Sequence, residues 1–109
     1  MIVVLKVGGS SAEDGAAQVV REAAGGRALV VVHGGGPQIS ALMRERDLVP
    51  RYVAGRRITD AASLACVDEG LRAVNAALCA DLEAAGLRTR GLPAGVVRAR
   101  RIAELGLVG

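Results

Sequence analysis

Three consecutive glycines, Gly34–Gly36, form the arrangement in this sequence that most clearly indicates chemistry. They follow the apolar run Leu29–Val32 and precede Pro37, which suits the first turn of a helix because an N–H group has no helical partner there. A strand, a glycine turn and a helix N-terminus in that order surround a space without side chains with backbone N–H groups. The pattern predicts a main-chain site for a phosphate or a carboxylate. The alternative is that the glycines only permit a tight turn.

A second glycine turn follows the first apolar run of the chain. Residues Ile2–Val7 include Lys6, the only lysine in the sequence, and lead into Gly8, Gly9 and Ser10. If both apolar runs are parallel strands buried on both faces, the two turns lie at the same edge of the sheet. A buried lysine is costly unless its charge is used, and beside an anion site it offers a point charge for phosphoryl transfer. The alternative is a lysine that extends to water at the strand end.

Two arginines and a histidine are further candidates. Arg57 could hold a carboxylate through two parallel hydrogen bonds, but Arg56 and Arg57 fit a solvated pair equally well. His33 is interpreted as a strand-end histidine bonded to backbone, because the sequence suggests no carboxylate near it. Cys66 and Cys79 lie several turns apart in one predicted helix, beyond disulfide reach, and are interpreted as apolar filler. With one histidine in the chain, no metal site is expected.

The composition bounds the class of protein. A chain of 109 residues has room for one domain, and its net charge of +3 permits an anionic ligand without requiring one. The chain has no Phe, no Trp and one Tyr, which argues against a nucleic-acid partner because single strands are usually stacked on aromatic rings. No apolar stretch approaches membrane-spanning length, and the start lacks a signal-peptide layout. We therefore expect a cytoplasmic protein with no membrane partner.

The predicted elements place these residues in an α/β protein with a mostly parallel sheet. The first strand, a helix and the second strand make one βαβ unit. The longest helix has apolar residues every three or four positions and can be capped by Thr59 or Asp60. The other elements are two more helices, a hairpin around Gly55 and two short strands. The predicted ranges are helices at 12–25, 37–47 and 60–85, a hairpin at 51–59, and strands at 87–91 and 95–99.

Three stretches together resemble the amino-acid kinase family, and within it the acetylglutamate kinases. They are Lys6–Ser10, His33–Ile39 and Gly55–Asp60, which match the family's N-terminal motifs in order and at similar spacing. Asn75 resembles the asparagine of the family's Asn-Lys pair, although the next residue is Ala76. LysW-aminoadipate kinases share the first two motifs, whereas the Gly-x-Arg-[Ile/Val]-Thr form of the third favours acetylglutamate kinases.

The resemblance implies a three-layer αβα open, mostly parallel sheet of the carbamate-kinase-like type. It also implies ATP- and Mg²⁺-dependent phosphorylation of the side-chain carboxylate of N-acetyl-L-glutamate, a step of arginine biosynthesis. Arg57 would hold the α-carboxylate of this acceptor, Lys6 would stabilise the transferring phosphoryl group, and Asn75 is a possible further contact. Family members pair through the long helix, so residues 60–85 are the expected homo-oligomer face. The remaining implied contacts are Gly8, Gly9 and Ser10 to the ATP phosphates, and Gly34, Gly35 and Gly36 to the phosphoryl end of the acceptor.

The sequence departs from the family pattern in two places. Residues 91–97 lack the aspartate of the family's Ser-Gly-x-Asp-Gly stretch, and the nucleotide-binding half has no counterpart. We therefore expect residues 1–109 to be a truncated, N-terminal acceptor-binding domain, with the C-terminal nucleotide-binding domain absent. Such a chain would be inactive alone, and its uncovered sheet would favour association. The alternatives are another amino-acid kinase and a non-enzymatic ligand-binding or dimerisation module.

Overall fold

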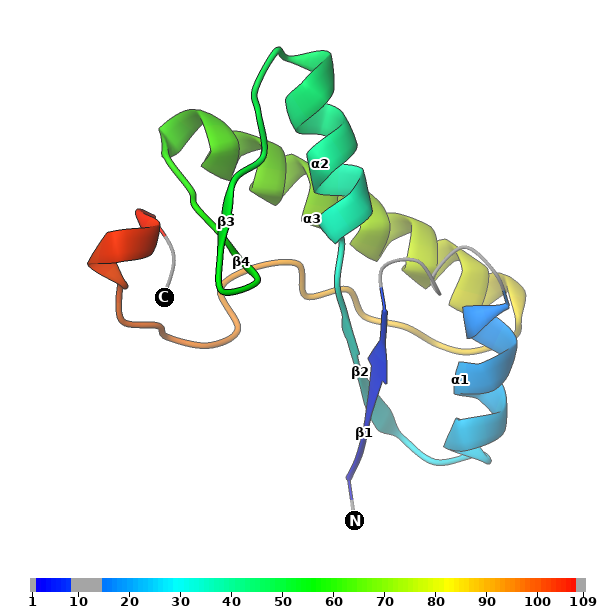
Figure 1. Ribbon diagram of the computed structural model, residues 1–109. Coiled ribbons are helices and arrows are strands. Elements are labelled where there is room, and N and C mark those ends of the chain that lie inside the picture. The colour runs from blue at the N-terminus through cyan, green and yellow to red at the C-terminus, as the bar shows by residue number, and fades with distance from the viewer. Residues whose placement is uncertain (1, 9–14, 108–109) are drawn as a thin grey trace.

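The computed structural model describes residues 2–8 and 15–107, and its centre is a pair of parallel strands (Figure 1). Strand β1 (Val3–Val7) pairs with β2 (Leu29–His33) in a register that sets Lys6 opposite Val32 and Val7 opposite His33. Helix α1 (Ala16–Ala24) lies between them in the chain. Because the strands are parallel, the residues that follow Val7 and His33 emerge at the same edge of the sheet.

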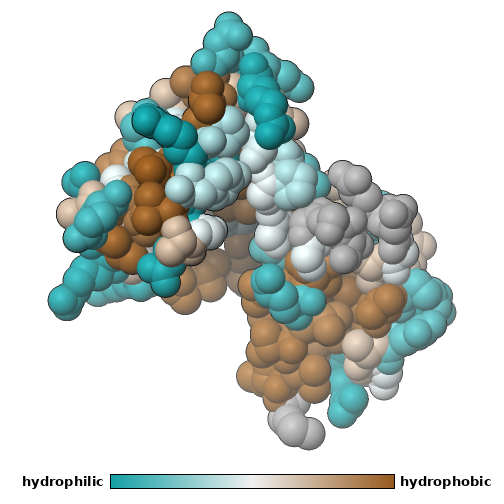
Figure 2. Space-filling view, in the orientation of Figure 1, coloured by the Kyte–Doolittle hydropathy of each residue, from teal (hydrophilic) through white to brown (hydrophobic). Residues whose placement is uncertain are grey.

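The described residues cover one face of this sheet and leave the other open. Val7 and the half-buried Leu5 and Val31 point towards α1 and the C-terminal half of α3 (Ala61–Ala84), where they pack around Val20. The side chains that alternate with these are exposed, at Val4, Lys6, Val30 and Val32. Figure 2 shows hydrophobic residues gathered on the surface over the region where Figure 1 places the two strands. The expectation that both strands are buried on both faces is therefore wrong.

A second core cluster joins α3 to α2 (Gly36–Glu45). Ile39, Met43 and Cys66 are its buried members, and the two helices cross where α3 has a glycine, Gly70. A Cβ atom at Gly70 would lie 2.9 Å from Cγ1 of Ile39. This glycine therefore lets the start of α2 approach α3 closely, which no other residue type would allow without displacement.

The predicted hairpin is confirmed as β3 (Tyr52–Val53) and β4 (Arg56–Arg57), an antiparallel pair. Ala54 and Gly55 connect the strands, with φ angles of 48° and 75°. Two consecutive residues with positive φ form the type I′ turn, whose twist suits a two-residue hairpin loop. The register places Tyr52 directly opposite Arg57.

The segment after α3 contains no strand longer than a single bridge in the described part of the chain. The strands predicted at 87–91 and 95–99 are therefore wrong, because an extended segment becomes a strand only when its backbone pairs with another strand. A short 3₁₀ helix, η1 (Ala103–Leu105), follows, and Leu105 is buried. The Thr59 N–H donates to the Leu105 carbonyl at 2.8 Å and the Leu107 N–H to the Thr59 carbonyl at 2.7 Å, so this end of the segment docks beside the start of α3.

The predicted class, α/β with a parallel sheet and helices, is confirmed. The three predicted helices are present, and Asp60 caps α3 by accepting a hydrogen bond from the Ser63 N–H at 2.8 Å. Residues 12–14 of the first predicted helix lie outside the described residues. In the described part, helices cover the sheet on one side, so the structure contains a single helical layer against two parallel strands.

Candidate functional site

Gly8 and Gly34, the first residues of the two glycine turns, lie at the same sheet edge, as the parallel strands require. The Gly34 N–H donates to the Val7 carbonyl at 3.4 Å, which ties the residue after β2 to the last residue of β1. Gly8 continues β1 at the same edge and is half-buried. Gly9 and Ser10, the other expected phosphate contacts, lie outside the described residues. The sequence-based placement of the two turns at one sheet edge is therefore confirmed where it is described.

The triple-glycine turn starts α2, and its glycines serve different purposes. Gly35 is the N-cap and is buried, and a Cβ atom there would lie 3.1 Å from Cδ2 of Leu71 on α3. Gly36 opens the helix and is exposed, and a Cβ atom there would meet nothing within 4 Å. Gly35 is thus small for packing, whereas Gly36 leaves open space at a helix N-terminus, where the first N–H groups lack helical partners.

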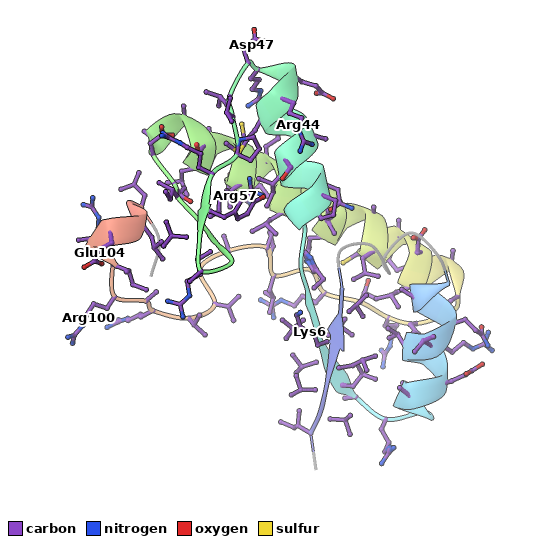
Figure 3. All side chains as sticks on the ribbon, viewed as in Figure 1. Lys6, Arg44, Asp47, Arg57, Arg100 and Glu104 are labelled. Atoms are coloured by element: carbon purple, nitrogen blue, oxygen red, sulfur yellow. The ribbon has the colours of Figure 1, made fainter. Side chains whose placement is uncertain are left out.

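Arg57 reaches this turn from the hairpin (Figure 3). Its Nη2 donates to the Gly36 carbonyl at 3.3 Å and to Oγ of the buried Ser40 at 3.0 Å, and its Nη1 lies 3.1 Å from Sδ of Met43. The adjacent Arg56 is exposed. The alternative of a solvated pair therefore fails for Arg57, because its guanidinium is packed against the start of α2.

Two residues that hold Arg57 were missed by the sequence reasoning. The guanidinium lies over the ring of Tyr52, with 5.0 Å between Cζ and the ring centroid, a distance at which cations are attracted to aromatic faces. The Tyr52 hydroxyl is also 3.1 Å from Oγ of Ser40. A signal for Tyr52 was available, since a two-residue turn at Ala54 and Gly55 pairs it with Arg57 across the hairpin. Ser40 lies one helical turn after Gly36, a weaker signal.

Lys6 stands on the uncovered face of β1, near the end that leads into the first glycine turn (Figure 3). Its side chain is exposed, so there is no cost of burying its charge that a function would have to offset. The described residues include no hydrogen-bond or ion-pair partner for its ammonium group. Lys6 and the triple glycine are at the same edge of the sheet, and the lysine is available to an anion there.

His33 and Asn75 meet behind the turn. Nε2 of His33 is 3.1 Å from Nδ2 of Asn75, and Nδ1 of His33 is 2.9 Å from the Gly34 carbonyl oxygen. The interpretation of His33 as a histidine bonded to backbone is confirmed, and α3 supplies its second partner. A groove of about 650 Å³ runs along the edge of β2 that faces away from β1 and reaches both side chains, but Arg57 and Gly36 do not line it.

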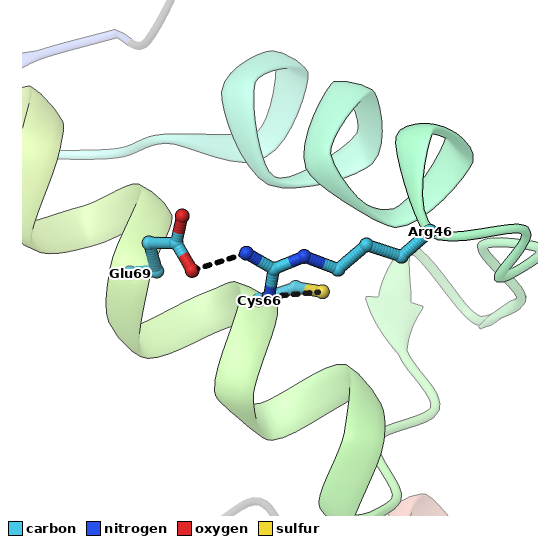
Figure 4. A network of polar contacts seen from close by, with 3 residues as sticks. All are labelled: Arg46, Cys66 and Glu69. Carbon is cyan, nitrogen blue, oxygen red and sulfur yellow. Dashed lines mark hydrogen bonds and ion pairs between the residues drawn. The ribbon is translucent and has the colours of Figure 1, made fainter.

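The charged side chains with perturbed pKa values lie apart from the turn. Hydrogen bonding to Glu69 raises the pKa of Arg46, whose guanidinium is 2.5 Å from that carboxylate and 3.8 Å from Sγ of Cys66 (Figure 4). The hydrogen bond from the Ser63 N–H lowers the pKa of Asp60. These exposed groups stabilise the ends of helices and the α2–α3 contact, which is a structural role.

The described residues contain no group of three or more His, Cys, Asp or Glu side chains that could hold a metal ion. They also contain no helix that is long and apolar enough to cross a membrane.

The comparison with protein families identifies the class. A sequence model of the amino acid kinase family matches residues 1–107, and the chain belongs to that family. It is 36% identical to the acetylglutamate kinase of Symbiobacterium thermophilum over 98% of this chain and 43% of the relative. It is 42% identical to the amino-acid acetyltransferase of Pseudomonas putida over 71% of this chain and 19% of the relative. The chain is an acetylglutamate-kinase-like region, and it spans less than half the length of these relatives.

A solved structure has a similar fold. The smu.665 protein of Streptococcus mutans superposes with a TM-score of 0.71 and is 31% identical, over 82% of this chain and 38% of that chain.

Proposed function

We propose that this region binds the acceptor in an ATP-dependent carboxylate kinase of the acetylglutamate kinase type, which serves arginine biosynthesis. The observation that carries the proposal is the contact between the Arg57 guanidinium and Gly36, at the start of the triple-glycine helix. N-acetyl-L-glutamate has two carboxylates, one for a guanidinium and one for a helix N-terminus, and the two binding groups are adjacent here. In this proposal Arg57 binds the α-carboxylate, and Gly34, Gly35 and Gly36 face the side-chain carboxylate.

The chemistry needs no nucleophile from the protein. An oxygen of the acceptor's side-chain carboxylate forms a bond to phosphorus as the bond to the ADP oxygen breaks, which yields an acyl phosphate and ADP. ATP, bound with Mg²⁺, supplies the phosphoryl group. The protein's part is to position the reactants and to stabilise negative charge. Lys6 is proposed to stabilise the transferring group, and Gly8, Gly9 and Ser10 to bind the ATP phosphates.

The residues described here fit phosphate oxygens better than they fit a metal ion. An exposed ammonium group at Lys6 and an open glycine turn at Gly36 are suitable partners for phosphate. The described part of the chain has no cluster of metal-ligating side chains, and we assign no residue of it to Mg²⁺.

The finer fold and domain assignments are part of the same proposal. We propose that residues 1–109 form the acceptor-binding domain of a three-layer αβα protein, in which a second helical layer covers the exposed side chains of Val4, Val30 and Val32. The 109 residues span 43% of the length of the Symbiobacterium acetylglutamate kinase. The chain alone is therefore expected to bind acceptor and to form no acyl phosphate.

Titration calorimetry with N-acetyl-L-glutamate tests the acceptor site. Arg57→Ala is expected to weaken binding about tenfold or more, since hydrogen bonds to charged groups contribute roughly 1.5–3 kcal/mol. Arg56→Ala is the matched control, because it removes the same charge from the exposed neighbouring position. N-acetyl-L-glutamine, which lacks the side-chain carboxylate, should bind more weakly than N-acetyl-L-glutamate. Equal affinities for the two arginine variants would remove Arg57 from the site.

A second candidate function is a ligand-binding or dimerisation module without kinase activity. The similarity to an amino-acid acetyltransferase favours it, because that relative carries a different activity in its name. The discriminating experiment mixes this chain with the C-terminal half of the Symbiobacterium relative and traps acyl phosphate with hydroxylamine. ATP-dependent product that is lost in Lys6→Ala supports the kinase, whereas acceptor binding without product supports the module. Trials with aminoadipate-type acceptors address the other amino-acid kinases.

Association of copies through α3 also remains a proposal. The face of α3 that points away from α1 and α2 carries many exposed alanines, together with Leu64, whose side chain is 40% exposed. Light scattering of the chain at high concentration is expected to show an oligomer, and Leu64→Glu is expected to reduce its mass. A monomer at all concentrations would contradict this.

A further inference from the structure

The ring of His33 is bonded on both sides, and the two bonds fix which nitrogen carries its proton. Nδ1 lies 2.9 Å from the Gly34 carbonyl oxygen, which can only accept, so Nδ1 bears the hydrogen and donates. The neutral ring then has a lone pair on Nε2. Nδ2 of Asn75, 3.1 Å away, can only donate, and it supplies the matching hydrogen. The structure therefore assigns the Nδ1–H tautomer to His33.

Asn75 is held in turn by its own neighbours. Sγ of Cys79, one turn further along α3, is 4.0 Å from Oδ1 of Asn75 and donates to it. Gly91 lies against the same amide, and a Cβ atom there would overlap Oδ1. The donors thus run in one direction, from Cys79 through Asn75 and His33 to the Gly34 carbonyl. In such a chain each hydrogen bond polarises the next.

This series of hydrogen bonds ends at the triple-glycine turn, which has no side chains of its own. In a trans peptide the carbonyl of one residue and the N–H of the next point in opposite directions. No cis peptide bond occurs among the described residues, so the Gly34 carbonyl and the Gly35 N–H obey this rule. A ring that holds the Gly34 carbonyl therefore also aims the Gly35 N–H away from His33.

We propose that Asn75 and His33 are positioning residues, which fix the direction of the Gly35 N–H at the anion site through the tautomer of His33. The identity of the anion rests on the function proposed above, whereas the hydrogen-bond chain does not. Neither residue is expected to touch the acceptor.

The tautomer can be measured directly, because His33 is the only histidine in the sequence. In the ¹⁵N-histidine-labelled chain at about pH 9, where an ordinary imidazole is neutral, long-range ¹H–¹⁵N correlation is expected to show Nδ1–H. Asn75→Asp is expected to place a proton on Nε2, because a carboxylate at this position accepts, whereas Asn75→Ala is expected to keep Nδ1–H, because the Gly34 carbonyl still accepts from Nδ1. An Nε2–H ring in the wild type, or an unprotonated Nε2 in Asn75→Asp, would overturn the proposal. Circular dichroism shows whether the two variants fold. If they do not, the tautomer in the ¹H–¹⁵N correlation spectrum of the wild type still tests the proposal.

Substitutions at His33 test the effect on binding. The amide nitrogen of asparagine falls near the position of Nδ1, whereas that of glutamine reaches the position of Nε2. His33→Gln is therefore expected to bind N-acetyl-L-glutamate about tenfold more weakly than His33→Asn, the loss expected for one hydrogen bond to an anion. Equal affinities or the reverse order would overturn the proposal. If the wild type binds no N-acetyl-L-glutamate, the proposed function fails and the tautomer measurement decides the positioning role alone.

Discussion

The substitution Gly70→Ala separates the effect of helix propensity from the effect of tertiary packing, because the first is expected to raise the stability of the fold and the second to lower it. Gly70 lies in the middle of α3, where replacing glycine by alanine stabilises an isolated helix by about 1 kcal/mol. In the folded protein the new Cβ atom would lie 2.9 Å from Cγ1 of Ile39 and 3.4 Å from its Cα. Cγ1 is bonded to the Ile39 Cβ and is not the far end of a flexible side chain, so Ile39 must leave its rotamer or α2 must shift. Overpacking of this kind costs about 1–3 kcal/mol.

The balance is a net loss of about 1 kcal/mol, which corresponds to a fall of roughly 5 °C in the midpoint of thermal unfolding. Urea and thermal unfolding followed by far-ultraviolet circular dichroism measure both quantities. Gly36→Ala is the matched control, because its Cβ atom would meet nothing within 4 Å. It is expected to leave stability unchanged or slightly higher. A Gly70→Ala variant that is more stable than the wild type would refute the close crossing of α2 and α3.

A functional readout accompanies the stability measurement. The Ile39 N–H donates to the Gly35 carbonyl at 2.9 Å, so a displacement at Ile39 is transmitted to the first turn of α2. Gly70→Ala is therefore expected to weaken acceptor binding although Gly70 does not face the acceptor.

Three other outcomes follow from the contacts described. The lowered pKa of Asp60 means that its cap stabilises the fold above the unfolded-state value of 3.8 and that this stability is lost as the pH falls through the lower folded value. The midpoint difference between wild type and Asp60→Ala should therefore shrink below about pH 4, and a difference independent of pH would contradict the cap. Tyr52 is the only tyrosine in a chain without Trp, so intrinsic fluorescence reports its contact with Arg57, and acceptor binding should change the emission in the wild type but not in Arg57→Ala. Cys79 is half-buried and Cys66 fully buried, so a thiol reagent should modify one cysteine in the native chain and two after unfolding.

The elements of the fold were predictable wherever local chemistry decides them. The spacing of apolar residues gave the long helix, which the structure has as Ala61–Ala84, and Gly55 indicated the hairpin turn. The strands expected at 87–91 and 95–99 were wrong because the pairing of an extended segment depends on partners that local sequence does not specify. Burial was also misjudged, since an apolar run is compatible with one covered face or with two.

Some residues of the candidate site could likewise be predicted from the sequence, and others could not. The glycines, Lys6 and Arg57 could be proposed from the sequence because the chemistry of anion binding restricts residue type and spacing. The roles of Ser40 and Tyr52 were not, because a serine on a helix and a tyrosine on a hairpin have many possible roles until a guanidinium lies between them.

The sequence by itself predicted an anion site at the glycine turns and determined the order of the helices and the hairpin, since both depend on residues close together in the chain. Only the tertiary structure decided that Arg57 rather than Arg56 reaches the turn, that Gly35 and Gly70 are small for packing, and that His33 is bonded to Asn75. Those outcomes depend on how helices and strands distant in sequence approach one another. That approach is governed by the shape of the packed core, which no single stretch of the chain encodes.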